Sequence, residues 1–174
     1  MLFGFLVLFW SIPLSQQPEL FNIHPCTNKI VFVAPPLASK ELDEALKFWH
    51  TLLPKVQMKK GEPGDSDATT VLIAFGVDPD FYTEEAFAWA YSLVPFEFNS
   101  RTGCLCYRHG LILLAPKLWR EVSRHRQEAL VHEIGHIIGF KDESTKLTIM
   151  AEQGWGFWRL NQAQQKGLAR AYAR

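Results

Sequence analysis

Short apolar runs and one helical pattern alternate over the first half of the chain. The run KIVFVAPP at residues 29–36 and the run TTVLIAFG at residues 69–76 are rich in β-branched side chains and stop at proline or glycine, so each predicts a buried strand. Between them, residues 39–53 place apolar side chains on one helical face, with Ser39 as the expected N-cap and Pro54 as the stop. The pattern therefore predicts a strand, a helix and a second strand.

The second half of the chain has a less regular pattern. Residues 86–114 contain the apolar runs FAWAYSLV, FEF, CLCY and LILLAP, which we interpret as further strands separated by turns, although EEAFAWAYSL also fits a helix. Residues 117–140 predict a long helix that Gly139 closes, with its cap at Ser123 if the first turns belong to a loop. Residues 159–174 predict a final helix. Together these elements predict an α+β fold with a mixed parallel and antiparallel sheet.

The N-terminal segment is apolar from Met1 to Leu14, which is short of the about 20 residues that a membrane-spanning helix needs. Such a run is typical of a secretory signal, although no cation precedes it, and a buried N-terminal strand or helix is the alternative. We expect residues 1–15 to be a signal peptide or an uncleaved anchor, residues 16–28 a linker, and residues 29–174 one folded domain. The protein is then secreted or extracytoplasmic, and contacts a membrane only if the segment stays attached.

Composition narrows the classes of function. Hydrophobic residues make up 48% of the 174 residues and charged residues 21%, so the chain can bury a core. Lys+Arg and Asp+Glu are equal at 18 each, which gives no basic surface to attract nucleic acid. In an exported chain Cys26 can pair with Cys104 or with Cys106 more easily than those two pair with each other, and three unpaired thiols are the alternative.

The segment VHEIGHIIGFKD carries the main chemical signal. His132 and His136 are four apart on the predicted helix, so they share one face and can bind one Zn²⁺. Glu133 points aside from this pair and can act as a general base toward a metal-bound water. Gly139 lets the chain turn back after the helix, which brings Asp142, a hard oxygen ligand, round to the same metal.

The segment HEIGHIIGFKD, with TIM after it, resembles the metzincin zinc endopeptidases, whose pattern is HExxHxxGxxH with a methionine turn under the metal. The spacing from Asp142 to Met150 is similar to that of the matrixin branch, and an aspartate as third ligand resembles the snapalysin-like proteases. The resemblance covers residues 29–174, with specific motifs only from His132 to Met150. It implies a twisted mixed sheet, an active-site helix, a methionine turn and a C-terminal helix.

The resemblance also implies a function and a role for each motif residue. The chain is expected to be a monomeric zinc metalloendopeptidase that acts on a peptide or protein substrate, with residues 29–174 as the catalytic domain. One catalytic zinc would be bound by His132, His136 and Asp142. Glu133 would activate the zinc-bound water that attacks the peptide bond, while Gly139 would form the turn. Met150 would pack beneath the metal without binding it.

Three alternatives compete with this assignment. Asp142 as a surface residue, outside the metal site, is the first. A catalytically silent binding module on the same scaffold is the second, and Glu133 argues against it because a structural metal site needs no base. A zinc amidase that acts on a non-protein amide is the third.

Other chemistry-bearing residues have plainer interpretations. His109 and His125 are expected to be structural, and a solvated loop is favoured over a Ca²⁺ site at Asp65 and Asp67. The edge strand that would bind an extended peptide is expected within residues 96–114, around CLCYRHG. Aromatic residues after the methionine form either a wall of the substrate pocket or ordinary core; these are Trp155, Phe157 and Trp158.

Overall fold

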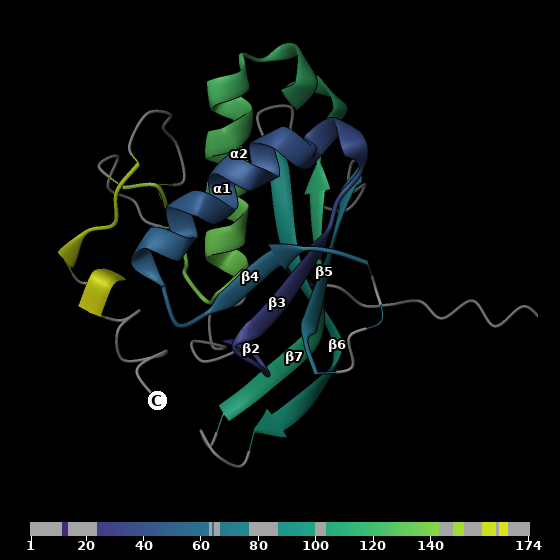
Figure 1. Ribbon diagram of the computed structural model, residues 1–174, viewed down its shortest axis with the longest axis vertical. Helices are drawn as coiled ribbons and strands as arrows, with labels where there is room; N and C mark the ends of the chain where they lie inside the picture. The colour runs from purple at the N-terminus through teal and green to yellow at the C-terminus, as the bar shows by residue number, and fades with distance from the viewer. Residues whose placement is uncertain are drawn as a thin grey trace, which may run out of the picture.

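The computed structural model describes residues 12–13, 24–62, 64, 67–76, 87–99, 104–142, 148–151, 158–162 and 164–166. Over these residues a seven-stranded mixed sheet packs against two helices (Figure 1). The predicted α+β class with a mixed sheet and few helices is therefore confirmed. Within the same residues, no helix has the length and apolar character that a membrane span requires.

Strands and helices follow one another in an order close to the predicted one. The strands are β1 (Ile12–Pro13), β2 (His24–Pro25), β3 (Lys29–Val33), β4 (Gln57–Lys60), β5 (Thr69–Phe75), β6 (Ala88–Asn99) and β7 (Cys104–Leu114). The α-helices are α1 (Ser39–Leu52) and α2 (Ser123–Ile137), preceded by the 3₁₀ turns η2 (Pro36–Ala38) and η3 (Pro116–Arg120). Of the final helix predicted over residues 159–174, Gln162 and residues 164–166 are helical, whereas residues 159–161 are not, so the helix begins later than predicted. Residue 163 and residues 167–174 lie outside the described residues.

The sheet has the order β1-β6-β7-β5-β3-β4, and its strands are parallel from β7 to β4. β6 is antiparallel to both β7 and β1. β6 pairs along one edge of β7. Two strands pair along the other edge, β2 at Cys106 and Tyr107 and β5 from His109 onward. The expectation of a substrate-binding edge around CLCYRHG is wrong for most of this segment, since Cys106, Tyr107, His109 and Gly110 of β7 are paired on both sides. Residues 96–99 of β6, within the expected range 96–114, pair with β7 alone among the described strands.

Two further expectations need correction. The four apolar runs within residues 86–114 are not four strands, because pairing between β6 and β7 joins them into two long strands with one irregularity between Leu93 and Phe96. Ser39 is not a helix cap: α1 starts at this residue and Ala38 occupies the cap position without a side-chain hydrogen bond. The Ser39 hydroxyl instead accepts a hydrogen bond of 2.8 Å from Lys60 Nζ.

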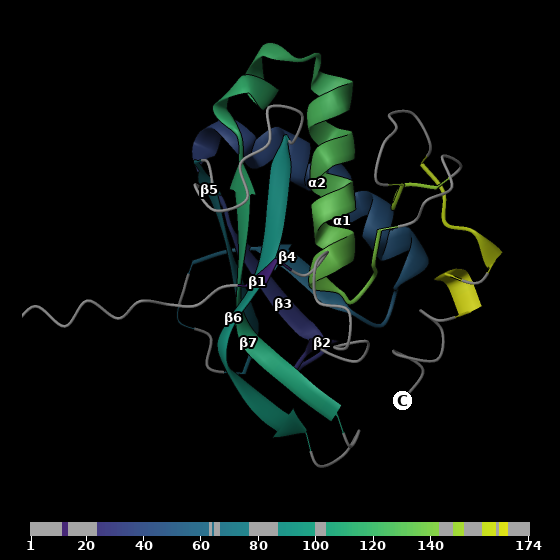
Figure 2. The same ribbon diagram turned by 180° about the vertical axis from the view of Figure 1, so that it is seen from behind.

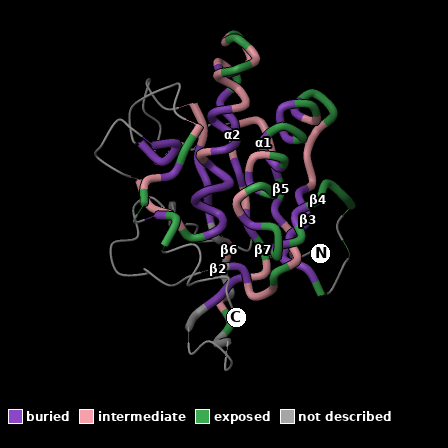
Figure 3. The backbone as a smooth tube through the Cα atoms, turned by 60° about the vertical axis from the view of Figure 1, so that its left-hand side comes forward, coloured by how far each residue is buried: buried purple, intermediate pink, exposed green. Residues whose placement is uncertain are grey.

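Both helices cover the same face of the sheet. Most of the predicted apolar face of α1 is buried and joins the sheet and α2 in one hydrophobic cluster; these residues are Leu42, Ala45, Leu46 and Trp49. Leu52 is only partly buried, and Glu41 is buried as well. In Figure 1 α1 crosses α2, and the view from behind in Figure 2 places α2 in front. An ion pair of 2.9 Å between Arg126 and the buried Glu41 links the first turns of the two helices. The second half of α2, coloured purple in Figure 3, is buried nearly all round, so its polar side chains require partners.

A disulfide anchors the chain before β3 to the sheet. Cys26 is bonded to Cys106 of β7, so of the two pairings left open by the sequence the structure shows this one. The Cys26 amide also donates to the Tyr107 carbonyl over 2.9 Å. Part of the expected linker, residues 24–26, is therefore joined to the domain.

Candidate metal centre

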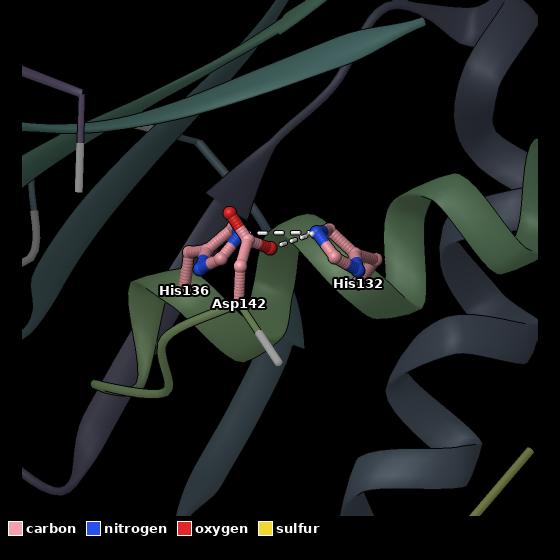
Figure 4. Close-up of side chains that lie close together, drawn as sticks. All are labelled: His132, His136 and Asp142. Atoms are coloured by element: carbon pink, nitrogen blue, oxygen red, sulfur yellow. Dashed lines mark hydrogen bonds and ion pairs between the residues drawn. The ribbon is translucent and has the colours of Figure 1, made fainter. Parts of the chain in front are cut away.

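The three side chains expected to bind metal, those of His132, His136 and Asp142, converge at the end of α2. The Nε2 atoms of His132 and His136 are 3.0 Å apart. Asp142 Oδ1 lies 3.0 Å from the first of these atoms and 3.2 Å from the second (Figure 4). In the described part of the chain, this is the one group of His, Cys, Asp and Glu side chains close enough to share a metal ion. Asp142 is thus beside both histidines, as expected of a third ligand.

A glycine turn at the end of α2 brings the aspartate back to the histidines. Gly139 has a φ of 103°, a conformation that residues with a Cβ rarely adopt. The Phe140 amide donates to the Gly135 carbonyl over 2.9 Å, and the Gly139 amide donates to the His136 carbonyl over 3.0 Å. This pair of bonds is the Schellman arrangement that ends many helices. Gly139 therefore has the positive φ expected of it at the end of α2, and Asp142 follows it on the returning chain.

Backbone carbonyls orient both imidazole rings. His132 Nδ1 is 2.8 Å from the Ile149 carbonyl, and His136 Nδ1 is 2.9 Å from the Phe140 carbonyl. A carbonyl oxygen can only accept a hydrogen bond, so each Nδ1 must carry the proton. In a neutral ring Nε2 is then unprotonated, which is the form that binds metals. Both lone pairs therefore point toward Asp142.

The donor set fits a cation. Two unprotonated nitrogens and a carboxylate oxygen repel one another at these distances, and the buried Asp142 Oδ1 has no hydrogen-bond donor among the described groups. A proton could join one pair of these atoms, held either by an imidazole or by the carboxyl group, and would leave the third atom without a partner. A metal ion can bind all three. Ligand atoms about 2.0–2.1 Å from a tetrahedral zinc are roughly 3.3 Å apart, close to the spacing here.

This geometry supports a metal site without selecting the metal. Two imidazoles and a carboxylate suit several divalent transition ions. The choice of zinc therefore belongs to the proposal below.

The pKa values of two carboxyl groups at the centre, Glu133 and Asp142, are shifted in opposite directions. Glu133 is 6% exposed, and desolvation by burial raises its pKa to about 7; the charge of Asp142 adds to this and His132 opposes it. Burial alone would also raise the pKa of Asp142, but hydrogen bonds from His132 and His136 and the positive charge of these rings, when they are protonated, outweigh burial and place that pKa well below its usual range. Asp142 is therefore ionised and ready to bind a cation, while Glu133 is poised to exchange a proton near neutral pH.

The segment that contains Met150 lies against α2. Met150 is fully buried and belongs to the main core cluster. The carbonyl that orients His132 belongs to the preceding residue, Ile149. Met150 thus packs in the core against the helix that carries both histidines, while its predicted place beneath a metal stays a prediction.

The other candidate residues lie outside this group. His109 is exposed, and His125 pairs with Glu121 over 3.2 Å, so neither histidine belongs to the candidate metal group. Trp158 is half-buried and donates to Glu128 over 2.9 Å. Asp67 is exposed; outside the described residues lie Asp65, Trp155 and Phe157.

The sequence did not indicate which groups support the ligands. Trp49 was expected in the core, but its indole Nε1 also donates to the Val131 carbonyl over 3.0 Å, just before the first histidine. The Tyr107 hydroxyl donates to the Ile137 carbonyl, just after the second. One feature of the sequence could have indicated this support: Gly135 stands inside a helical pattern, and such a glycine often marks close packing.

Comparison with known proteins adds no relative. No protein-family model matches the chain, and no match is found among curated proteins. The fold and the metal centre are therefore the evidence from which a function can be inferred.

Proposed function

We propose that the protein is a zinc-dependent endopeptidase of the metzincin type. His132, His136 and Asp142 would be the zinc ligands and Glu133 the general base. One observation carries the proposal: three potential ligand atoms, two imidazole nitrogens and a carboxylate oxygen, converge at about 3 Å, and Glu133 beside the first histidine is buried. A metal site that serves only structure has no use for a base beside it.

Each residue has a definite task in this proposal. Zinc, when bound, would act as a Lewis acid toward water and toward the carbonyl of the scissile bond. Glu133 would accept a proton from the attacking water and donate it to the departing amine. A pKa near neutrality suits both transfers. Asp142 gives the ligand set a negative charge that three neutral histidines would lack, so we expect a weaker Lewis acid than in a three-histidine site.

Element order supports the metzincin assignment. The helix α1 connects the parallel strands β3 and β4, and α2 follows β7. The glycine turn and the methionine turn come next along the chain, and both contact α2. These features accompany the motif residues in the order that the resemblance implies.

Substrate and location are also part of the proposal. An extended peptide would pair with β6, the outermost long strand of the described sheet, where β1 contacts only Tyr91 and Ser92. The Cys26–Cys106 bond suits an oxidising compartment, which supports a protein that acts outside the cytoplasm. Ile12 and Pro13, within the expected signal segment, pair with β6, which favours the alternative that this part of the segment stays with the domain.

Zinc content and proteolysis of an unfolded protein test this function together. Purified protein with stoichiometric zinc should hydrolyse casein. Glu133→Ala should retain zinc and lose activity by about 10²–10⁴-fold, because it removes the base and no ligand. Glu44→Ala, which changes an exposed glutamate on α1, is the matched control and should retain activity. Unchanged hydrolysis by Glu133→Ala would refute the mechanism, and zinc binding without hydrolysis would indicate a silent binding module.

A further inference from the structure

The side chain of Met150 lies in a space that exists because residue 135 is a glycine. A Cβ atom on Gly135 would overlap the Met150 sulfur and would lie 2.9 Å from its Cε. The end of the Met150 side chain cannot move aside into solvent, since Met150 is fully buried. Gly135 stands between the two metal-binding histidines on α2, so the methionine packs directly against the helix that carries both ligands.

Trp49 of α1 fills the same space from another direction. Its Cζ2 atom would be 3.2 Å from the Cβ of residue 135. Its Nε1 donates to the Val131 carbonyl, and its ring stacks on Phe140 with 5.7 Å between centroids and 23° between planes. The indole is fully buried. One side chain, 82 positions before Val131, thus contacts the helix before the first ligand and the turn after the second.

These contacts lead to the two carbonyls that orient the histidines. Phe140, on which Trp49 stacks, supplies the carbonyl for His136. Ile149, which precedes Met150, supplies the carbonyl for His132. A displacement of the indole or of the methionine would therefore move an acceptor and turn the ring that depends on it.

We propose that Trp49 is a positioning residue of the metal centre, which acts with Met150 to fill the space beside Gly135 and so fixes both carbonyl acceptors. The inference rests on the proposed metal-binding function. Replacement of glycine by alanine inside a helix ordinarily stabilises the helix. The inference predicts the opposite effect at residue 135, where the added methyl group should impair metal binding.

Metal affinity and metal geometry are the readouts. Zn²⁺ affinity would be measured by chelator competition and Co²⁺ coordination by visible absorption, with the melting temperature of the metal-free protein as a check of folding. Gly135→Ala should bind Zn²⁺ about tenfold or more weakly, the range for lost ligand support. Adding Met150→Ala to that variant should restore part of the affinity, because the pair shares one space.

Trp49→Phe tests the indole with a milder change. It should weaken Zn²⁺ binding severalfold and shift the Co²⁺ absorption. Trp119→Phe is the matched control, since Trp119 packs on Phe75 and under Arg126, and it should change neither. If Gly135→Ala does not fold, the double variant and Trp49→Phe decide the question.

The outcomes separate this inference from the proposed function. Wild-type affinity and spectrum in both Gly135→Ala and Trp49→Phe would refute the positioning role alone. The predicted pattern of affinities without any proteolysis would retain the positioning role and refute the endopeptidase. A wild-type protein that binds neither Zn²⁺ nor Co²⁺ would refute both.

Discussion

The Nε2 atoms of His132 and His136 lie 3.0 Å apart while both Nδ1 atoms face backbone carbonyls. Because the rings already have the orientation for a shared ion, binding should require little rearrangement. A ligand that binds the folded state stabilises it by mass action. Metal at a hundredfold excess over its dissociation constant should add about 2.7 kcal/mol to the free energy of unfolding. Thermal melts with zinc and with a chelator would measure this, and identical melting temperatures would contradict it.

Asp142 should contribute to metal affinity through its charge and its position. Asp142→Ala should lose most of the bound zinc, while Asp142→His should retain a substantial part because imidazole is also a zinc ligand. Zinc content after dialysis is the measurement. Asp43→Ala, which removes an exposed aspartate from α1, should retain zinc as the wild type does. Equal zinc in all four proteins would mean that Asp142 is not a ligand.

Glu133 should make the metal-free protein less stable as the pH rises toward neutrality. Its pKa is about 7 in the folded state and 4.5 ordinarily, so the folded state binds the proton more tightly. The resulting stabilisation is fully present below about pH 4.5 and is lost as the pH rises through 7. The shift corresponds to a free energy on the order of 3 kcal/mol.

Urea unfolding in a chelator at pH 5 and pH 7 would show this dependence. Glu133→Gln should remove most of the difference between the two pH values, and Glu44→Gln should leave it. Asp142 has a lowered pKa and acts in the opposite sense, but only in more acidic solution, as the pH falls below its ordinary value. The same pH slope in wild type and Glu133→Gln would exclude Glu133 as its source.

Substitution of Glu41, the buried member of the Arg126–Glu41 ion pair, should lower the stability of the fold. Glu41→Gln leaves Arg126 without its charge partner and should lower the free energy of unfolding by about 2–3 kcal/mol, since the guanidinium is partly exposed. The exposed Lys60–Asp43 pair is the comparison, and Asp43→Asn should cost at most about 1 kcal/mol. Denaturant unfolding would measure both, and equal effects would contradict a special role for burial.

Loss of the disulfide should destabilise the fold more than any single contact described above. The bond joins residues 80 apart, for which chain-entropy arguments give about 4 kcal/mol. Cys26→Ser and Cys106→Ser should have similar unfolding midpoints, both below that of the wild type. Treatment of the wild type with a reductant should give the same shift, and unequal midpoints for the two variants would point to effects other than the bond.

The sequence predicted those elements whose hydrophobic pattern lies within one continuous segment. The helix α1 and the strands β3 and β5 carry their periodicity within one segment, and the ligand spacing from His132 to Asp142 depends on one helix and one turn. The alternative start of α2 near Ser123 was correct to one residue, but Ser123 is the first helical residue and Val122, without a side-chain hydrogen bond, occupies the cap position.

Features that depend on distant segments could not be predicted. The runs FAWAYSLV and FEF form one strand because β7 pairs with both, and this pairing is not encoded in either run. Ser39 has the composition of a cap, but the 3₁₀ turn before it places Ala38 in that position. The contact of Trp49 with Val131 spans 82 positions, so only the fold could show that a core tryptophan supports the metal centre.

The Cys26–Cys106 bond divides the molecule in a way that proteolysis would expose. It closes a covalent ring that contains β3, α1, β4, β5 and β6 and leaves α2 and the metal ligands outside. One backbone cut within the ring would leave a single covalent molecule until a reductant opened it. One cut between residues 107 and 131 would leave the ligand-bearing fragment attached through noncovalent contacts only, such as the bond from Trp49 to Val131.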